Sequence, residues 1–164
     1  STQGYSSAAS DVYKRQIEHT PGAGAAGGTG GGVLGLFNAT VKPGIELVLN
    51  LAHGREACAW TDVVITGEGS IDSQTPYGKV PSGIAKLAQS QGKPTIAIGG
   101  TVTRDPHTVE ALNETGIIAT FGIAPGPADL TTLIANTERN VEITCAAIAS
   151  TLRITAATSL CESA

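Results

Sequence analysis

The chain has 164 residues, a length typical of one domain. Only 15% of the residues are charged and 41% are hydrophobic, so the composition excludes an intrinsically disordered chain. The net charge of -4 provides no basic surface for phosphodiester backbones, and we therefore expect no nucleic-acid partner. No apolar run approaches the roughly 18 residues that a membrane helix needs, so no membrane partner is expected either.

The N-terminal stretch, residues 1–16, differs in composition from the glycine-dense segment that follows it. It is polar and lacks the apolar centre of a signal peptide. We expect it to be a leader that is foreign to the protein or disordered.

The cysteines favour a reducing compartment. Cys58, Cys145 and Cys161 lie far apart and form no C-x-x-C pair, which argues against a disulfide framework and a zinc knuckle. We therefore expect a cytoplasmic protein.

The first predicted element is a glycine-rich loop at residues 21–32, PGAGAAGGTGGG, which leads into a short apolar helix at residues 33–37. A second helix is expected from Pro43. The loop contains G-x-G-x-x-G, but no apolar strand precedes it and no acidic strand end follows it, which disfavours a nicotinamide-binding fold. Two interpretations stay open: the glycine amides bind an anion at the helix N-terminus, or the glycines allow close helix packing.

Three short apolar runs predict buried parallel strands at residues 63–65, 95–98 and 117–123. We expect the first strand to end at Gly67-Glu68-Gly69 and the second to end at Gly99-Gly100.

Helices are predicted between and after these strands. The first lies around residues 84–88 and ends near Gly92, and the second begins with Asp105 as N-cap and Pro106 in its first turn. An apolar stripe over residues 129–152 predicts one long amphipathic helix. This alternation predicts an α/β fold, a parallel sheet with helices on both faces, whose ligands bind at the carboxyl ends of the strands.

The segment after the first strand carries the densest set of reactive side chains, with Glu68, Asp72 and Lys79 close together in sequence. It is not a P-loop, because Val80 occupies the place of the Mg²⁺-binding Ser or Thr. Carboxylates here can hold Mg²⁺ or accept a hydroxyl proton, and the lysine can stabilise charge on a transferring phosphoryl group. The alternative is a solvated loop with a surface lysine, and the location at a strand's carboxyl end favours function.

Residues 62–88, DVVITGEGSIDSQTPYGKVPSGIAKLA, resemble the type I glycerate kinases of bacteria through the pattern GEGxxDxQTxxGK. The resemblance extends over about residues 18–152, whereas residues 1–16 match nothing in that family. Family members are more than twice this length and begin with an Asp-Ser-Phe-Lys type motif. The chain therefore resembles the C-terminal part of such an enzyme.

The resemblance implies a Rossmann-like fold in two parts. Residues 17–60 would be the end of a smaller, inserted, glycine-rich α/β domain, and residues 61–164 the C-terminal portion of the Rossmann-like domain. The active site would lie in the cleft between them.

The resemblance also implies a kinase that transfers the ATP γ-phosphoryl group to D-glycerate with Mg²⁺, giving 2-phosphoglycerate. Glu68, Asp72 and Lys79 would be catalytic, with Asp72 as a candidate Mg²⁺ ligand, and the division of base and metal ligand between the two carboxylates stays open. Substrate or phosphate would be bound by Gly24, Gly27, Gly28, Gly30, Gly67, Gly69, Gln74, Thr75 and Gly78.

The alternative is a truncated, catalytically inactive α/β fragment that only binds ligand. In either case an unpaired edge strand would favour association into homo-oligomers.

Overall fold

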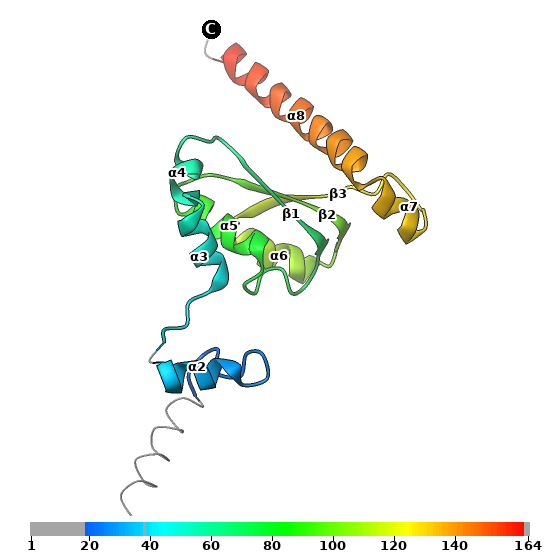
Figure 1. The fold of residues 1–164 in the computed structure, drawn as a ribbon. Coiled ribbons are helices and arrows are strands. Elements are labelled where there is room, and N and C mark those ends of the chain that lie inside the picture. The colour runs from blue at the N-terminus through cyan, green and yellow to red at the C-terminus, as the bar shows by residue number, and fades with distance from the viewer. Residues whose placement is uncertain (1–18, 38, 163–164) are drawn as a thin grey trace, which may run out of the picture. The chain divides into compact units, whose positions relative to one another are not determined.

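A computed structural model describes residues 19–37 and 39–162, with side chains as far as residue 153. The chain divides into two compact units, residues 1–44 and 45–164 (Figure 1). The division therefore falls earlier than the predicted boundary at 60/61, and the assignment of the two parts to domains stays a prediction. The predicted leader lies outside the described residues.

In the first unit, a series of turns leads into helix α2 (Thr29–Phe37), which begins within the glycine run. The predicted order of glycine loop and helix is therefore confirmed. Helix α3 (Gly44–Leu51) follows Pro43 as expected and leads the chain into the second unit. A further helix, α4 (Gly54–Ala59), was not predicted from the sequence, and His53 before it has a left-handed backbone with φ 53°.

The second unit is built on a parallel sheet in the order β1 (Val64–Ile71), β2 (Thr95–Val102) and β3 (Ile117–Gly122). The predicted parallel sheet is confirmed. The expected strand ends were wrong, because β1 and β2 continue through their glycines and Glu68 pairs with Gly99 in register. A Cβ on Gly100 would lie 2.8 Å from the carbonyl oxygen of Gly69, so glycine at this position permits close approach of two strands and does not end one.

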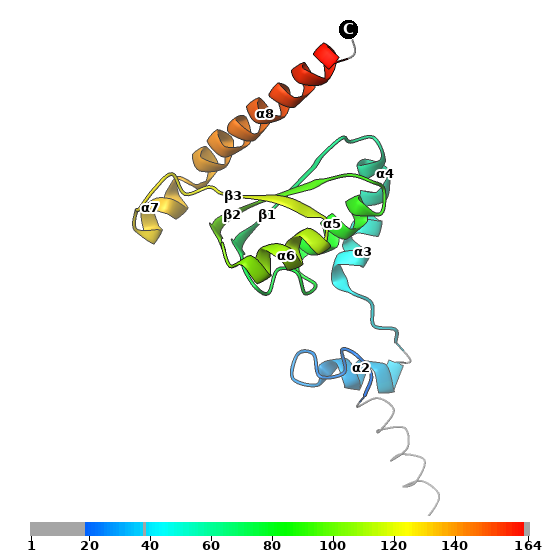
Figure 2. The same cartoon turned by 180° about the vertical axis from the view of Figure 1, so that it is seen from behind.

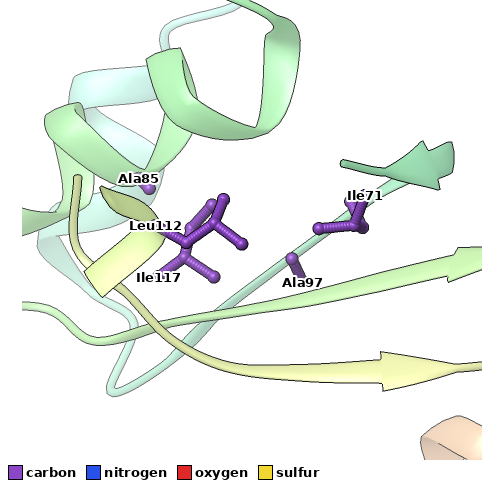
Figure 3. Packing of buried hydrophobic residues seen from close by; sticks show 5 residues of the cluster. All are labelled: Ile71, Ala85, Ala97, Leu112 and Ile117. Carbon is purple, nitrogen blue, oxygen red and sulfur yellow. The ribbon is translucent and has the colours of Figure 1, made fainter. Parts of the chain in front are cut away.

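Helices α5 (Val80–Gln89) and α6 (Pro106–Glu114) pack on one face of the sheet. The start of α6 is as predicted, because the Asp105 carboxylate accepts a hydrogen bond from the Thr108 amide at 2.9 Å. The buried core between these layers, shown in Figure 3, consists of Ile71, Ala85, Ala97, Leu112 and Ile117.

The predicted long C-terminal helix is two helices, α7 (Leu130–Ala135) and α8 (Thr137–Glu162). The break falls at Asn136, whose side-chain amide donates to the carbonyl oxygen of Thr132 at 2.8 Å. The backbone amide of Asn136 donates to the same carbonyl at 3.1 Å, and the helix ends because Asn136 leaves the helical conformation, with φ −103° and ψ 13°. An apolar stripe alone does not reveal such a break. Figures 1 and 2 show α7 and α8 on the side of the sheet opposite α5 and α6.

The second unit is thus an α/β layer structure with helices on both faces of a parallel sheet, as the sequence predicted. In the part of the chain that the structure describes, no helix is long and apolar enough to cross a membrane.

Candidate functional site

The loop that follows β1 is a tight turn stabilised by its own hydrogen bonds. The amide of Asp72 donates to Thr75 Oγ1 at 3.0 Å, and the amide of Thr75 donates back to the Asp72 carbonyl oxygen at 3.0 Å. Thr75 is fully buried, so this residue, predicted to bind substrate, anchors the loop. The Gln74 amide donates to Asp72 Oδ1 at 2.9 Å, while the residue itself is exposed.

The structure brings together the three residues predicted to be catalytic. Lys79 Nζ lies 3.3 Å from Asp72 Oδ1 and 3.9 Å from Glu68 Oε1. Lys79 is the residue before α5, and Gly78 with φ +96° gives the backbone a left-handed turn just ahead of it. The cluster lies where β1 leads into α5, at the carboxyl end of the strand, which is the usual position of ligand sites in open α/β sheets.

The two carboxylates of this charged cluster differ in their surroundings. The hydrogen bond from the Gln74 amide lowers the pKa of Asp72 most; partial burial opposes this, and the hydrogen bond and charge of Lys79 lower the pKa further. Asp72 is therefore ionised at neutral pH. Glu68 has a buried oxygen, Oε2, that accepts no hydrogen bond from any described residue. One carboxylate is committed to local contacts and the other keeps a free acceptor.

Two hydroxyls extend the cluster across the sheet, and the sequence analysis missed both. Thr101 Oγ1 donates to Ser70 Oγ at 3.0 Å, and the Ser70 hydroxyl helps to lower the pKa of Asp72. Thr101 follows Gly99-Gly100 at the end of the second predicted strand, and this position was the only signal in the sequence that could have pointed to it.

A pocket of about 560 Å³ opens beside the cluster, between the sheet and the pair α7–α8. Its volume lies within the range of about 300–1,000 Å³ that is common for small-molecule sites. The strand side is formed by Gly67, Glu68, Gly69, Ile98, Gly99, Gly100 and Thr101, and the helix side by Leu130, Leu133, Ile134, Thr137, Asn140 and Val141. The predicted site residues Gly67 and Gly69 thus lie in a pocket wall.

The glycine loop of the first unit uses part of its backbone internally. The amide of Gly28 donates to the carbonyl oxygens of Gly24 and Ala25, and the amide of Gly30 donates to Ala25 at 3.2 Å. The amides of Gly24 and Gly27 donate to no residue within the described range. Of the four loop glycines predicted to bind phosphate, two therefore retain a free donor.

Among residues 19–37 and 39–162, no group of three His, Cys, Asp or Glu side chains is placed to hold a metal ion. Glu68 and Asp72 provide two carboxylates. Mg²⁺ in phosphoryl-transfer sites commonly takes one or two carboxylates together with substrate phosphates, so this donor set fits an ion brought in with a nucleotide.

Comparison with known proteins gives a consistent result. The model of the glycerate kinase family matches residues 2–153. The chain is 46% identical over 111 residues to a glycerate kinase of Halalkalibacterium halodurans and 42% identical over 107 residues to a glycerate 2-kinase of Escherichia coli. These alignments cover 68% and 65% of this chain. The matched range includes residues 2–16, which corrects the expectation that this stretch lies outside the family.

A crystal structure described as glycerate kinase 2 from Salmonella typhimurium LT2 is similar in fold, with a TM-score of 0.63 and 34% sequence identity over 89% of this chain. The chain spans 28%, 27% and 37% of these three proteins, so it corresponds to about a third of their length.

Proposed function

This chain belongs to the glycerate kinase family, and on that premise we propose that the whole enzyme transfers the ATP γ-phosphoryl group to the carbon-2 hydroxyl of D-glycerate, giving 2-phosphoglycerate. The observation that supports this most is the position of Lys79, held by two carboxylates at the carboxyl end of a parallel strand. Phosphoryl transfer depends mainly on positioning and on neutralising negative charge, and this arrangement supplies both.

We assign the two carboxylates different roles. A carboxylate with a lowered pKa is a poor proton acceptor, so Asp72 orients Lys79 and stays ionised. The Glu68 side chain is 31% exposed and lies at the pocket, and its carboxylate takes the proton of the substrate hydroxyl. Lys79 stabilises the charge on the transferring group.

Mg²⁺ would be held by Asp72 together with the phosphates of the nucleotide, and it would neutralise their charge. The free amides of Gly24 and Gly27 would bind an anionic group of a substrate.

The test is an assay of ADP release with ATP, Mg²⁺ and D-glycerate, performed on the product of the complete reading frame that contains this chain. Phosphorus NMR of the product distinguishes 2-phosphoglycerate from 3-phosphoglycerate. We expect Lys79→Met to lower kcat by about 10²- to 10³-fold. Lys86→Met is the matched control and should retain activity, because Lys86 is an exposed lysine on α5, the helix that follows Lys79.

Absence of glycerate-dependent ADP release from the wild-type protein would refute the proposed activity. Activity that survives in Lys79→Met would remove this residue from the mechanism.

The second candidate is that this chain on its own is an inactive ligand-binding fragment. It is favoured by the coverage, because the chain spans only about a third of the length of its relatives. If the remaining part of such an enzyme supplies groups to the active site, the transition state loses charge stabilisation without it. The same assay on this chain alone decides: we expect no turnover, and turnover at roughly 1–100 per second would contradict the fragment interpretation.

A further inference from the structure

The pocket beside the charged cluster is suited to an uncharged group. Within the described part of its lining there is no lysine, arginine or histidine, and the charged residue at its border is Glu68. An acidic border repels a phosphate or the carboxylate of glycerate. The pocket therefore does not suit the anionic parts of either substrate.

The sheet side of the pocket is kept open by a glycine that packing does not require. A Cβ added to Gly69 would meet no described atom within 4 Å outside its chain neighbours, and its backbone φ is not positive. Gly67 differs, because a Cβ there would lie 3.1 Å from Ile98 Cγ1. Since neither strain nor packing explains Gly69, its bare backbone leaves room for something else above the sheet.

The helix side of the pocket presents one buried amide. Asn140 is only 7% exposed and lines the pocket, yet its side chain makes no hydrogen bond to another described residue. The amide atoms themselves are not sealed from solvent, so they open into the pocket and can pair with a bound ligand. Apart from Thr137, the other helix residues that line the pocket are apolar, Leu133 and Val141 among them.

We propose that this pocket holds the adenine base of the nucleotide, with the Asn140 amide paired to an edge of the base. The side-chain NH₂ of an asparagine donates and its oxygen accepts, and these match the ring nitrogen N7 and the N6 amino group on one edge of adenine. The same edge of guanine presents two acceptors, N7 and O6, and an asparagine cannot satisfy both. The nucleotide's phosphates would then lie outside the pocket at Lys79, whose ammonium lies 3.9 Å from Glu68 and offsets its charge.

This inference rests on the proposed kinase function, because it assigns the nucleotide part of the same site. It is tested by calorimetric titration of the product of the complete reading frame with ADP, GDP and inorganic tripolyphosphate. The variants are Asn140→Leu, which removes the amide at similar volume, and Val141→Trp, which fills the pocket. The controls are Asn113→Leu on α6 and Ile143→Trp, an exposed position on α8.

We expect both pocket variants to raise the Kd for ADP by about tenfold or more and to leave the Kd for tripolyphosphate unchanged. Asn140→Leu should also reduce the preference for ADP over GDP without lowering the melting temperature, because the amide has no partner in the fold to lose. The two controls should match the wild type.

An ADP affinity that both variants leave within about twofold of wild type would overturn the proposal, as would no ADP binding by the wild type. If ADP binds and the variants weaken it, but no glycerate is phosphorylated, the base pocket stands and the proposed function fails.

Discussion

The two glycine-rich regions of this protein use glycine for different physical reasons. In the loop before α2, Gly27 and Gly28 have positive φ values of 66° and 93°, and carbonyl oxygens of the loop accept hydrogen bonds from the amides of Gly28 and of Gly30 at the start of α2. In the sheet, a side chain on Gly100 would collide with the neighbouring strand, and one on Gly67 would be in tight contact with Ile98. The loop needs glycine for its chain path, whereas the sheet needs it for close approach.

This difference shows that glycine density by itself does not locate a ligand site. The loop contains the G-x-G-x-x-G pattern, which suggests a ligand site, although many of its backbone amides donate hydrogen bonds within the loop itself. The reactive side chains gather at the sheet, where glycines are fewer. The predictions below separate positions that serve chemistry from positions that serve the chain path.

The largest effect is expected at the charged cluster, where Asp72→Asn should lower kcat by about 10²-fold or more and leave the melting temperature nearly unchanged. The neutral amide cannot hold the Lys79 ammonium in place as the carboxylate does. Steady-state kinetics and thermal melting measure the two effects. Asp62→Asn, an exposed aspartate ahead of β1, is the matched control. A wild-type kcat in Asp72→Asn would exclude it from catalysis.

The next largest effect is on stability. Gly100→Val should lower the free energy of unfolding by about 1–3 kcal/mol or more, because its Cβ meets the Gly69 carbonyl oxygen at 2.8 Å. Gly69→Ala should leave stability within about 0.5 kcal/mol of wild type, although it narrows the pocket and raises the KM for ATP. Chemical denaturation of both variants tests the pair. Equal losses of stability in the two variants would refute the proposal that Gly100 makes room for the neighbouring strand and Gly69 for a ligand.

In the glycine loop, two substitutions separate strain from ligand contact. Gly28→Val should lower the melting temperature because its φ of +93° is unfavourable for valine, and it should raise the KM for glycerate or ATP if the loop binds an anion. Gly24→Ala has no positive φ and no neighbour in its way, so it should leave the melting temperature unchanged and alter KM only a few-fold. If Gly28→Val lowers the melting temperature with unaltered kinetics, the loop is a packing device.

The smallest effect is expected at Asp105, the N-cap of α6, which lies outside both glycine-rich regions. The Thr108 amide, then its hydroxyl, lowers the pKa of Asp105, so this N-cap stabilises the fold above the pKa of the unfolded chain and loses its effect as pH falls through the folded value. Asp105→Ala should therefore melt a few degrees below wild type at pH 7. In thermal melts this gap should shrink as the pH falls below the ordinary pKa of an aspartate and through the lowered pKa of Asp105. A gap independent of pH would contradict the capping role.

Local sequence was sufficient for the features that depend on neighbours along the chain. The charged cluster could be predicted because Glu68, Asp72 and Lys79 lie on one strand and the loop after it, which brings them close whatever the rest of the fold does. The start of α6 could be predicted for the same reason, since Asp105 bonds an amide three residues away. The parallel sheet followed from the alternation of short apolar runs with helices.

The sequence alone determined the order of elements, the α/β class and the charged loop, because these depend on periodicity and on contacts a few residues apart. Only the tertiary structure decided where β1 and β2 end, since a glycine permits a strand to continue or to stop and the neighbouring strand settles which. It likewise decided that Thr101 meets Ser70, and that Asn140 faces a cavity next to the glycines of two strands. Such residues are distant in sequence, and no local pattern encodes the packing that brings them together.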